Sequence, residues 1–212
     1  MKSFLRLLEP RRFELKEKRS LFIAQVAPVQ REEEAAAFWG EVKEEHRNAT
    51  HNCPAWRLLS GEFCSDDGEP GGTAGRPMLG VMLRRDLYCL AAVVTRYFGG
   101  VKLGPRGLIE AYSGALEGAL EGAAVGKATI AQSLTLTTDY DRAKSLSHFF
   151  GALPLSGAVQ TQWLEQVTLC APVALEDKEA VAQALATHQY AQLLLGEPIW
   201  GPQEVVALRE EE

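Results

Sequence analysis

A glycine-rich stretch, SDDGEPGGTAGRPM (residues 65–78), carries three acidic side chains within four residues. At this spacing Asp66, Asp67 and Glu69 could hold a hard divalent cation through their carboxylate oxygens. The same residues could instead form a plain turn, in which the aspartates bond to their own backbone and glycine supplies a positive φ. No further ligand set accompanies the three carboxylates, so the turn is favoured and no metal is predicted.

The glycines around Thr73 indicate a second chemistry for this stretch. The backbone N–H groups of Gly71, Gly72 and Gly75 could form a nest that receives an anion. The stretch lacks the GKS or GKT ending of a P-loop. Nucleotide hydrolysis of that type is therefore not expected.

A second glycine-rich stretch, VTRYFGGVKLGPRGL (residues 94–108), places Arg96 and Lys102 on either side of Gly99 and Gly100. An arginine that ends an apolar strand requires a partner. Either a carboxylate of the first stretch or an external phosphate would serve. Both can hold if the ion pair orients the guanidinium toward a ligand.

Aromatic side chains and a histidine complete the candidate site. Tyr97 and Phe98 could stack on a nucleobase, although at least one of them is expected to pack in the core. A catalytic set of Ser65, His51 and Asp67 can be composed on paper, but no GxSxG elbow accompanies it. The prediction therefore leans against an enzyme, and no catalytic residue is assigned.

The composition is that of an ordinary globular protein, with 212 residues, 46% hydrophobic and 24% charged. This length suffices for one large domain or two modest ones. The four cysteines form no CxxC pair, and a zinc site would have to rely on His51, Cys53 and Cys64 without an evident fourth ligand. No apolar run approaches the roughly 18 residues of a membrane span. We predict a cytoplasmic protein with no cofactor and no membrane partner.

The net charge of −6 is unevenly distributed. Residues 1–130 hold 18 basic and 17 acidic residues, whereas residues 131–212 hold 4 basic and 11 acidic residues. Because the second part repels polyanions, any affinity for a phosphate backbone must be local to the first part.

Apolar periodicity predicts strands and helices that alternate around the two glycine-rich stretches. A tight turn or a bulge near Arg19 and Ser20 is expected to divide the first strand region. The elements expected in the first part are strands within 12–27, a helix over 30–47, a strand over 51–59, a helix over 77–84, a strand over 87–98 and a helix over 108–123.

After a boundary at residues 125–131, the pattern reads β-α-β-β-α-β, which is the ferredoxin-like arrangement. The elements expected there are strand 133–138, helix 140–150, strands 158–164 and 166–173, helix 176–188 and strand 190–200. The last residues form an acidic tail that is expected to fray.

Several long motifs in order resemble the IMPACT family, in its bacterial YigZ-type form. They are KEKRSLFIAQVAPV, residues 49–56, FCSDDGEPGGTAGRPML, VTRYFGGVKLG and GLIEAY. The resemblance implies an α+β protein of two domains. Residues 1–128 would form an IMPACT N-terminal domain with the ribosomal protein S5 domain 2-like fold, shared with domain IV of the translocation elongation factor (elongation factor G). Residues 131–205 would form a ferredoxin-like domain similar to domain V of that factor, followed by the acidic tail at 206–212.

The chain departs from the family pattern in the second stretch. Pro105 and Arg106 stand where the family usually has a small residue and a glycine, and Glu110 replaces a basic residue. Arg106 restores the lost positive charge one turn earlier. Asn52 stands where many members have a second histidine, which weakens any mechanism that needs paired histidines.

The family resemblance also concerns function, since its eukaryotic relatives are associated with control of translation initiation under stress. We expect a non-enzymatic factor that associates with RNA or the ribosome and binds phosphate through both glycine-rich stretches. The alternative is an enzyme or binding protein for a phosphorylated small molecule, with or without a divalent cation. A third option is a protein-interaction module that uses the acidic C-terminal domain. The residues predicted to bind the ligand or nucleic acid are His51, Asp66, Asp67, Glu69, Gly72, Thr73, Gly75, Arg96, Tyr97, Gly99, Gly100, Lys102 and Arg106.

Overall fold

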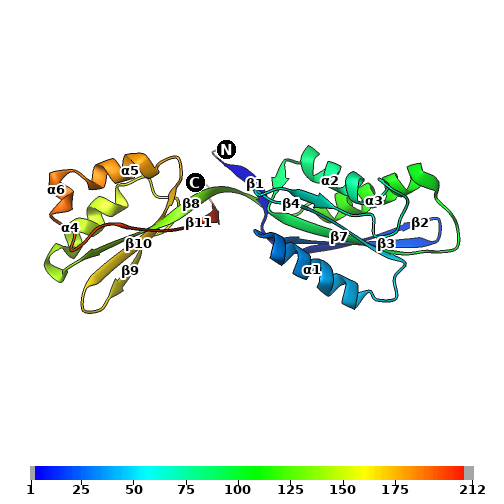
Figure 1. Ribbon diagram of the computed structural model, residues 1–212, viewed down its shortest axis with the longest axis horizontal. Helices are drawn as coiled ribbons and strands as arrows, with labels where there is room; N and C mark the ends of the chain where they lie inside the picture. The colour runs from blue at the N-terminus through cyan, green and yellow to red at the C-terminus, as the bar shows by residue number, and fades with distance from the viewer. Residues whose placement is uncertain (1–2, 208–212) are drawn as a thin grey trace. The chain divides into compact units, whose positions relative to one another are not determined.

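The structure of the protein is a computed structural model that describes residues 3–207, apart from the side chains of residues 188 and 189. The chain divides into two compact units (Figure 1). Phe4–Gly126 forms the N-terminal unit, and the chain from Lys127 onward forms the C-terminal unit. Both units mix helices with sheets, so the predicted α+β class with two units is confirmed.

The N-terminal unit is built on a five-stranded antiparallel sheet with the order β2-β3-β7-β4-β5. Its strands are β2 (Arg11–Glu17), β3 (Ser20–Pro28), β4 (His51–Arg57), β5 (Glu62–Cys64) and β7 (Leu90–Tyr97). Two further short strands, β1 (Phe4–Leu7) and β6 (Leu87–Tyr88), pair with each other in parallel. The sequence analysis missed β1 and β5, which are too short to show a periodicity of their own.

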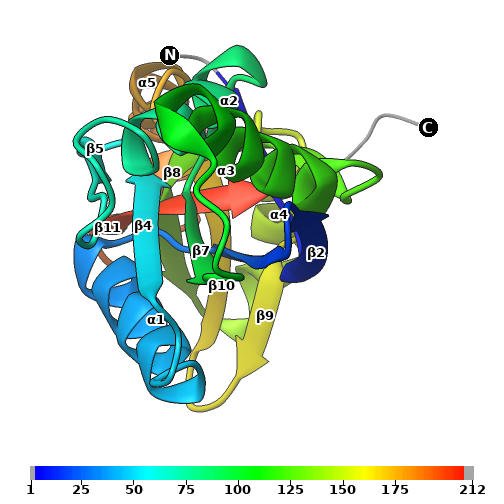
Figure 2. The same cartoon turned by 90° about the vertical axis from the view of Figure 1, so that its right-hand side faces the viewer.

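Helices cover both faces of this sheet (Figures 1 and 2). Helix α1 (Glu32–Glu45) packs on one face, and α2 (Gly75–Arg84) and α3 (Gly104–Leu120) pack on the other. Because β7 lies between these layers, its side chains are buried on both faces, which explains its continuous apolar sequence. Tyr112 of α3 is fully buried in the larger core, between the sheet and helices α2 and α3.

The predicted turn between β2 and β3 is a two-residue loop formed by Lys18 and Arg19, whose φ values are 43° and 68°. Two positive φ values in a two-residue hairpin loop match the twist of the flanking strands. The strand predicted over 87–98 is interrupted at Cys89, whose φ is 57°. Helix α3 begins at Gly104 rather than residue 108, because Pro105 stands in its first turn, where a missing N–H costs nothing.

The C-terminal unit has the element order β-α-β-β-α-β, with one short extra helix before the last strand. Its four strands lie in the order β11-β8-β10-β9, with every neighbouring pair antiparallel. The elements are β8 (Val125–Thr138), α4 (Tyr140–Gly151), β9 (Gln160–Trp163), β10 (Val167–Ala174), α5 (Lys178–Leu185), α6 (His188–Ala191) and β11 (Ile199–Ala207). Helix α4 begins where predicted, because Asp139 accepts a hydrogen bond from the N–H of Arg142 at 2.9 Å and caps it.

The strand predicted over 190–200 is wrong. Residues up to Ala191 form α6, and the last strand begins only at Ile199. Leu193 and Leu194 follow α6 and pack against the core of the C-terminal unit from an irregular segment. A short apolar run indicates burial, and periodicity alone does not say which backbone conformation achieves it.

Two other predictions concern the boundary between the two parts of the chain and the acidic tail. The segment 125–131, predicted as a boundary, belongs to the continuous strand β8. Of the predicted acidic tail at 206–212, Val206 and Ala207 end β11, and residues 208–212 lie outside the described residues. Across residues 3–207, no helix combines the length and the apolar character that crossing a membrane requires.

Candidate functional site

The two glycine-rich stretches meet around a cavity of about 390 Å³ in the N-terminal unit, here called the loop pocket. Strands β4 and β7, the loop after β5, the loop after β7 and the first turn of α3 contribute to its wall. The lining side chains that carry the argument are Thr50, His51, Glu69, Arg96, Phe98 and Lys102.

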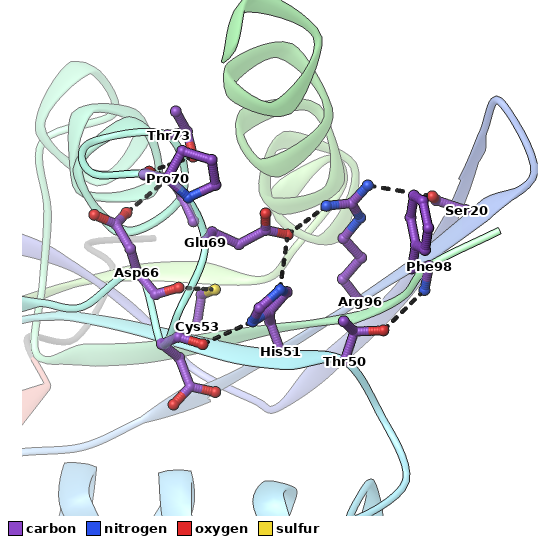
Figure 3. Close-up of polar contacts among 12 residues, drawn as sticks. Ser20, Thr50, His51, Cys53, Asp66, Glu69, Pro70, Thr73, Arg96 and Phe98 are labelled. Carbon is purple, nitrogen blue, oxygen red and sulfur yellow. Dashed lines mark hydrogen bonds and ion pairs between the residues drawn. The ribbon is translucent and has the colours of Figure 1, made fainter. Parts of the chain in front are cut away.

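A buried ion pair joins the two stretches at this pocket (Figure 3). Arg96 Nη1 donates to Glu69 Oε1 at 2.6 Å, and the two residues are only 5% and 8% exposed. The hydroxyl of Tyr112 donates to the same oxygen at 2.9 Å, and Arg96 Nη2 donates to Ser20 Oγ at 3.5 Å. Among the described residues, Arg96 Nε has no hydrogen-bond partner. Of the two partners left open for Arg96, the structure shows a carboxylate.

His51 is held in one orientation beside this pair (Figure 3). Its Nδ1 lies 2.7 Å from the backbone oxygen of Asp67. Because a carbonyl oxygen can only accept, Nδ1 must carry the proton. In the neutral ring Nε2 is then an acceptor, and it lies 3.9 Å from Glu69 Oε1. A neutral His51 therefore offers a fixed acceptor at the wall of the loop pocket, whereas a protonated His51 would form an ion pair with Glu69.

The predicted anion-binding nest exists, but a carboxylate of the chain itself fills it. Asp66 Oδ1 accepts from the N–H groups of Ala74 and Gly75, both at 2.9 Å, and Oδ2 accepts from Gly72 at 2.7 Å. Burial alone would raise the pKa of Asp66, but these three hydrogen bonds outweigh it and hold that pKa below its usual value. Thr73 is also engaged, since its hydroxyl donates to the Pro70 oxygen at 2.6 Å.

An Asp66→Asn variant is expected to lose about 2 kcal/mol of unfolding free energy at neutral pH, because one amide oxygen replaces a charged acceptor of three N–H groups. A lowered pKa in the folded state stabilises the fold above the unfolded-state pKa, and this stabilisation disappears as the pH falls through the folded-state pKa. The difference between wild type and variant in urea unfolding should therefore shrink in the acid range. Asp86→Asn is the control, because Asp86 is exposed and should change stability by less than about 0.5 kcal/mol. An equal loss in both variants would contradict the assigned role of Asp66.

The acidic cluster of the first stretch does not converge on one point. Asp66 faces the start of α2, and Glu69 faces Arg96. Asp67 accepts from the Asn52 N–H at 2.7 Å and lies 3.5 Å from Lys43 Nζ. No group of three or more His, Cys, Asp or Glu side chains within residues 3–207 is placed to hold a metal ion.

The remaining predicted residues separate into those inside and outside the loop pocket. Lys102 lines it and forms no hydrogen bond or ion pair with any described residue. Tyr97 points to the other face of the sheet, where its hydroxyl forms a 3.0 Å hydrogen bond with His46 Nδ1. Arg106 is exposed outside the pocket lining, and its Nε donates to Glu110 Oε1 at 2.9 Å. The charge that Arg106 restores in sequence is thus not restored in the pocket.

Neither Gly99 nor Gly100 is part of the pocket lining, although both shape the chain between Phe98 and Lys102. Phe98 itself lines the pocket; the sequence analysis named it with Tyr97 as a possible stacking ring but kept only Tyr97 among the predicted binding residues. The two-residue period of a strand could have found it, since it places Arg96 and Phe98 on one face and Tyr97 on the other.

The chain is similar to known proteins along the whole region that forms this pocket. The family model of the Impact N-terminal domain matches residues 18–120. "IMPACT family member YvyE" of Bacillus subtilis is 46% identical over 113 residues, which is 52% of each chain. The match thus spans about half the length of that relative. "IMPACT family member YigZ" of Escherichia coli is 35% identical over 139 residues, which is 63% of this chain and 68% of the relative. A crystal structure described as a hypothetical protein is 29% identical, covers 100% of both chains and has a TM-score of 0.66.

Proposed function

The chain belongs to the IMPACT family, and on that premise we propose that it is a non-enzymatic factor that associates with RNA or the ribosome and regulates translation. The loop pocket is the RNA contact in this proposal. Family membership supports the translational role, and the chemistry of the pocket supports the RNA contact.

One observation carries the proposal: an exposed aromatic ring and a cation without a partner among the described residues lie at the same pocket. Phe98 is 45% exposed, and Lys102 lines the same cavity. Proteins recognise single-stranded RNA by stacking bases on aromatic rings and by pairing cations with phosphate. A cavity of about 390 Å³ is within the size range of small-ligand sites and suits one nucleotide unit.

The basic residues have different roles in this proposal. Arg96 is neutralised by Glu69, and its guanidinium carbon lies 5.3 Å from the centre of the Phe98 ring. Arg96 therefore makes a cation–π contact that supports the Phe98 ring, and it does not supply the phosphate contact. Lys102 supplies it, while Arg106 is paired outside the pocket. Few phosphate contacts imply weak binding, whose salt dependence has a slope of about −0.7 per contact with a single strand.

Co-sedimentation of the full chain with ribosomes, at low and moderate salt, tests the proposal. Phe98→Ala is expected to weaken binding by about 1–3 kcal/mol through lost stacking. Lys102→Ala should weaken binding and reduce the salt slope by about 0.7. Arg106→Ala is the matched control, since it removes the same charge outside the pocket and should leave binding unchanged. Equal binding by all four proteins would contradict the assignment to this pocket.

A phosphorylated small molecule is the second candidate ligand. The fixed acceptor of His51 at the pocket wall favours it, because such an acceptor could bind a hydroxyl of the ligand. If the protein does not pellet with ribosomes at low salt but nucleoside monophosphates raise its melting temperature, this second function replaces the first. Loss of that thermal shift in Lys102→Ala, and not in Arg106→Ala, would assign the ligand to the loop pocket.

The finer description of the fold belongs to the same proposal. We assign the ribosomal protein S5 domain 2-like fold to residues 1–128 and the ferredoxin-like fold to residues 131–205. The element order β-α-β-β-α-β and the strand order β11-β8-β10-β9 support the second assignment. A cytoplasmic location, where ribosomes and RNA are present, is part of the proposal.

A further inference from the structure

Strand β9 of the C-terminal unit lies at the end of its sheet, and among the described strands it pairs only with β10 (Figure 1). All four of its residues are exposed. Its sequence, Gln-Thr-Gln-Trp, contains no proline and no charge. Edge strands are usually protected against pairing with another chain by prolines, charges or bulges. The free edge of β9 has neither of the first two.

A groove runs beside this edge, between β9 and helix α4, with a volume of about 440 Å³. Its floor is formed by the buried side chains Val167 and Leu169 of β10. Tyr140 and Trp163 stand at the groove and are 55% and 58% exposed, with ring centres 5.6 Å apart. The Tyr140 hydroxyl donates to the backbone oxygen of Leu164 at 2.6 Å, so the aromatic pair is anchored to the end of β9.

We propose that this groove binds an extended peptide of a partner protein, which adds a strand to the free edge of β9 and inserts an apolar side chain above Val167 and Leu169. In strand addition the backbone hydrogen bonds supply affinity, and pockets for alternate side chains supply specificity. The groove can provide both, because the edge strand β9 and the apolar floor lie side by side next to helix α4.

The charges favour a peptide over RNA. The chain from residue 131 onward holds 4 basic and 11 acidic residues, which repel a polyanion. Inside the groove the balance differs, since Lys144 lines it and none of the described carboxylates does. His148 lies one turn along the same face of α4. A peptide with a single Asp or Glu next to its apolar residue therefore matches the groove, whereas a densely charged chain does not.

The test begins with a phage library of random peptides selected on the full-length protein, followed by titration of the enriched peptides as fluorescent synthetic probes. The enriched sequences are expected to combine alternating apolar residues with one acidic residue. Trp163→Ala should weaken their binding about 30-fold or more, as expected for an aromatic anchor. Lys144→Glu should reverse the preference toward peptides with Lys or Arg. Lys127→Glu, the same change at an exposed site outside the groove, should leave binding unaltered.

The backbone contact needs its own variants. Successive N–H groups of a strand point to opposite sides, so Thr161→Pro and Gln162→Pro remove one N–H that faces β10 and one that faces outward. The variant that keeps its circular dichroism spectrum should be the one that loses peptide binding. Failure to enrich any peptide, equal binding by wild type, Trp163→Ala and Lys144→Glu, or displacement of the peptides by polyuridylate would each overturn the proposal. Since the groove and the loop pocket lie in different units, Lys102→Ala should not affect peptide binding.

Discussion

Replacing Arg96 by alanine is expected to reduce the free energy of unfolding of the N-terminal unit by about 4 kcal/mol, because the Glu69 carboxylate stays buried without its cation. Both side chains are almost fully enclosed, and their contact is direct at 2.6 Å. After the substitution, the Tyr112 hydroxyl is the one donor to Glu69 Oε1 that remains among the described residues. Guanidinium chloride unfolding followed by circular dichroism measures the loss.

Two further variants make this expectation specific. Arg106→Ala removes an exposed arginine from an exposed pair and should leave the free energy of unfolding nearly unchanged. The double variant Arg96→Met with Glu69→Leu should recover part of the loss, because both charges then leave the interior together. If Arg96→Ala unfolds at the same denaturant concentration as Arg106→Ala, the ion pair is solvated in solution and the proposed support of Phe98 by Arg96 fails with it.

Replacing Gly99 by alanine is expected to cost about 3 kcal/mol, since two backbone segments touch there. An added Cβ would overlap the backbone oxygen of Arg19 and would lie 2.6 Å from its Cβ. The Gly99 N–H also donates to Ser20 Oγ at 3.3 Å. This contact fixes the second glycine-rich stretch to the turn between β2 and β3, and thereby sets the position of Phe98. Thermal and urea unfolding should show the loss of stability, and ribosome binding should show the effect on Phe98.

The neighbouring glycine is the control. Gly100 has a φ of +84°, but an added Cβ would have no atom within 4 Å. Gly100→Ala should therefore cost only the strain of the left-handed backbone, about 1 kcal/mol. Equal losses for the two variants would mean that backbone conformation, and not the close approach to Arg19, makes glycine necessary in this stretch.

The sequence predicted the parts of the fold that depend on local patterns. The continuous apolar run of β7 and the proline at the start of α3 identify these elements without knowledge of their neighbours. The last strand was misplaced because the leucines at 193 and 194 are partly buried against the core without being in a strand. Where the local pattern is compatible with both a strand and an irregular segment, tertiary packing decides which of the two forms.

The candidate site was predicted less completely, because its chemistry depends on which charges meet. The pattern identified both glycine-rich stretches, and it left three carboxylates as partners for one arginine. The structure pairs Glu69 with Arg96 and directs Asp66 to the start of α2. These choices follow from contacts between residues far apart in the chain, so no local spacing could reveal them. Phe98 was the exception, since strand alternation places it beside Arg96.

Arg106 and Glu110 are two of the departures from the family pattern on α3, and their charges cancel each other. Arg106 and Glu110 are one helical turn apart and form an ion pair on the exposed surface. The pair therefore adds no net charge beside the loop pocket. Pro105, in contrast, lines the pocket and stands in the first turn of the helix. Of these departures, Pro105 is therefore the one that alters the shape of the site.

The rate at which the buried Cys53 thiol is alkylated reports how often the N-terminal unit opens locally. Its burial, together with the nearby carboxylates of Glu69, Asp67 and Asp66, raises the pKa of this thiol to about 12 against a weaker opposing effect of Tyr112. Since only thiolate reacts with alkylating reagents, the folded state protects Cys53 both by enclosure and by protonation. The half-buried Cys64 in the same unit is the internal comparison. The ratio of the two labelling rates therefore records how often the core around Cys53 becomes accessible, without any probe being introduced.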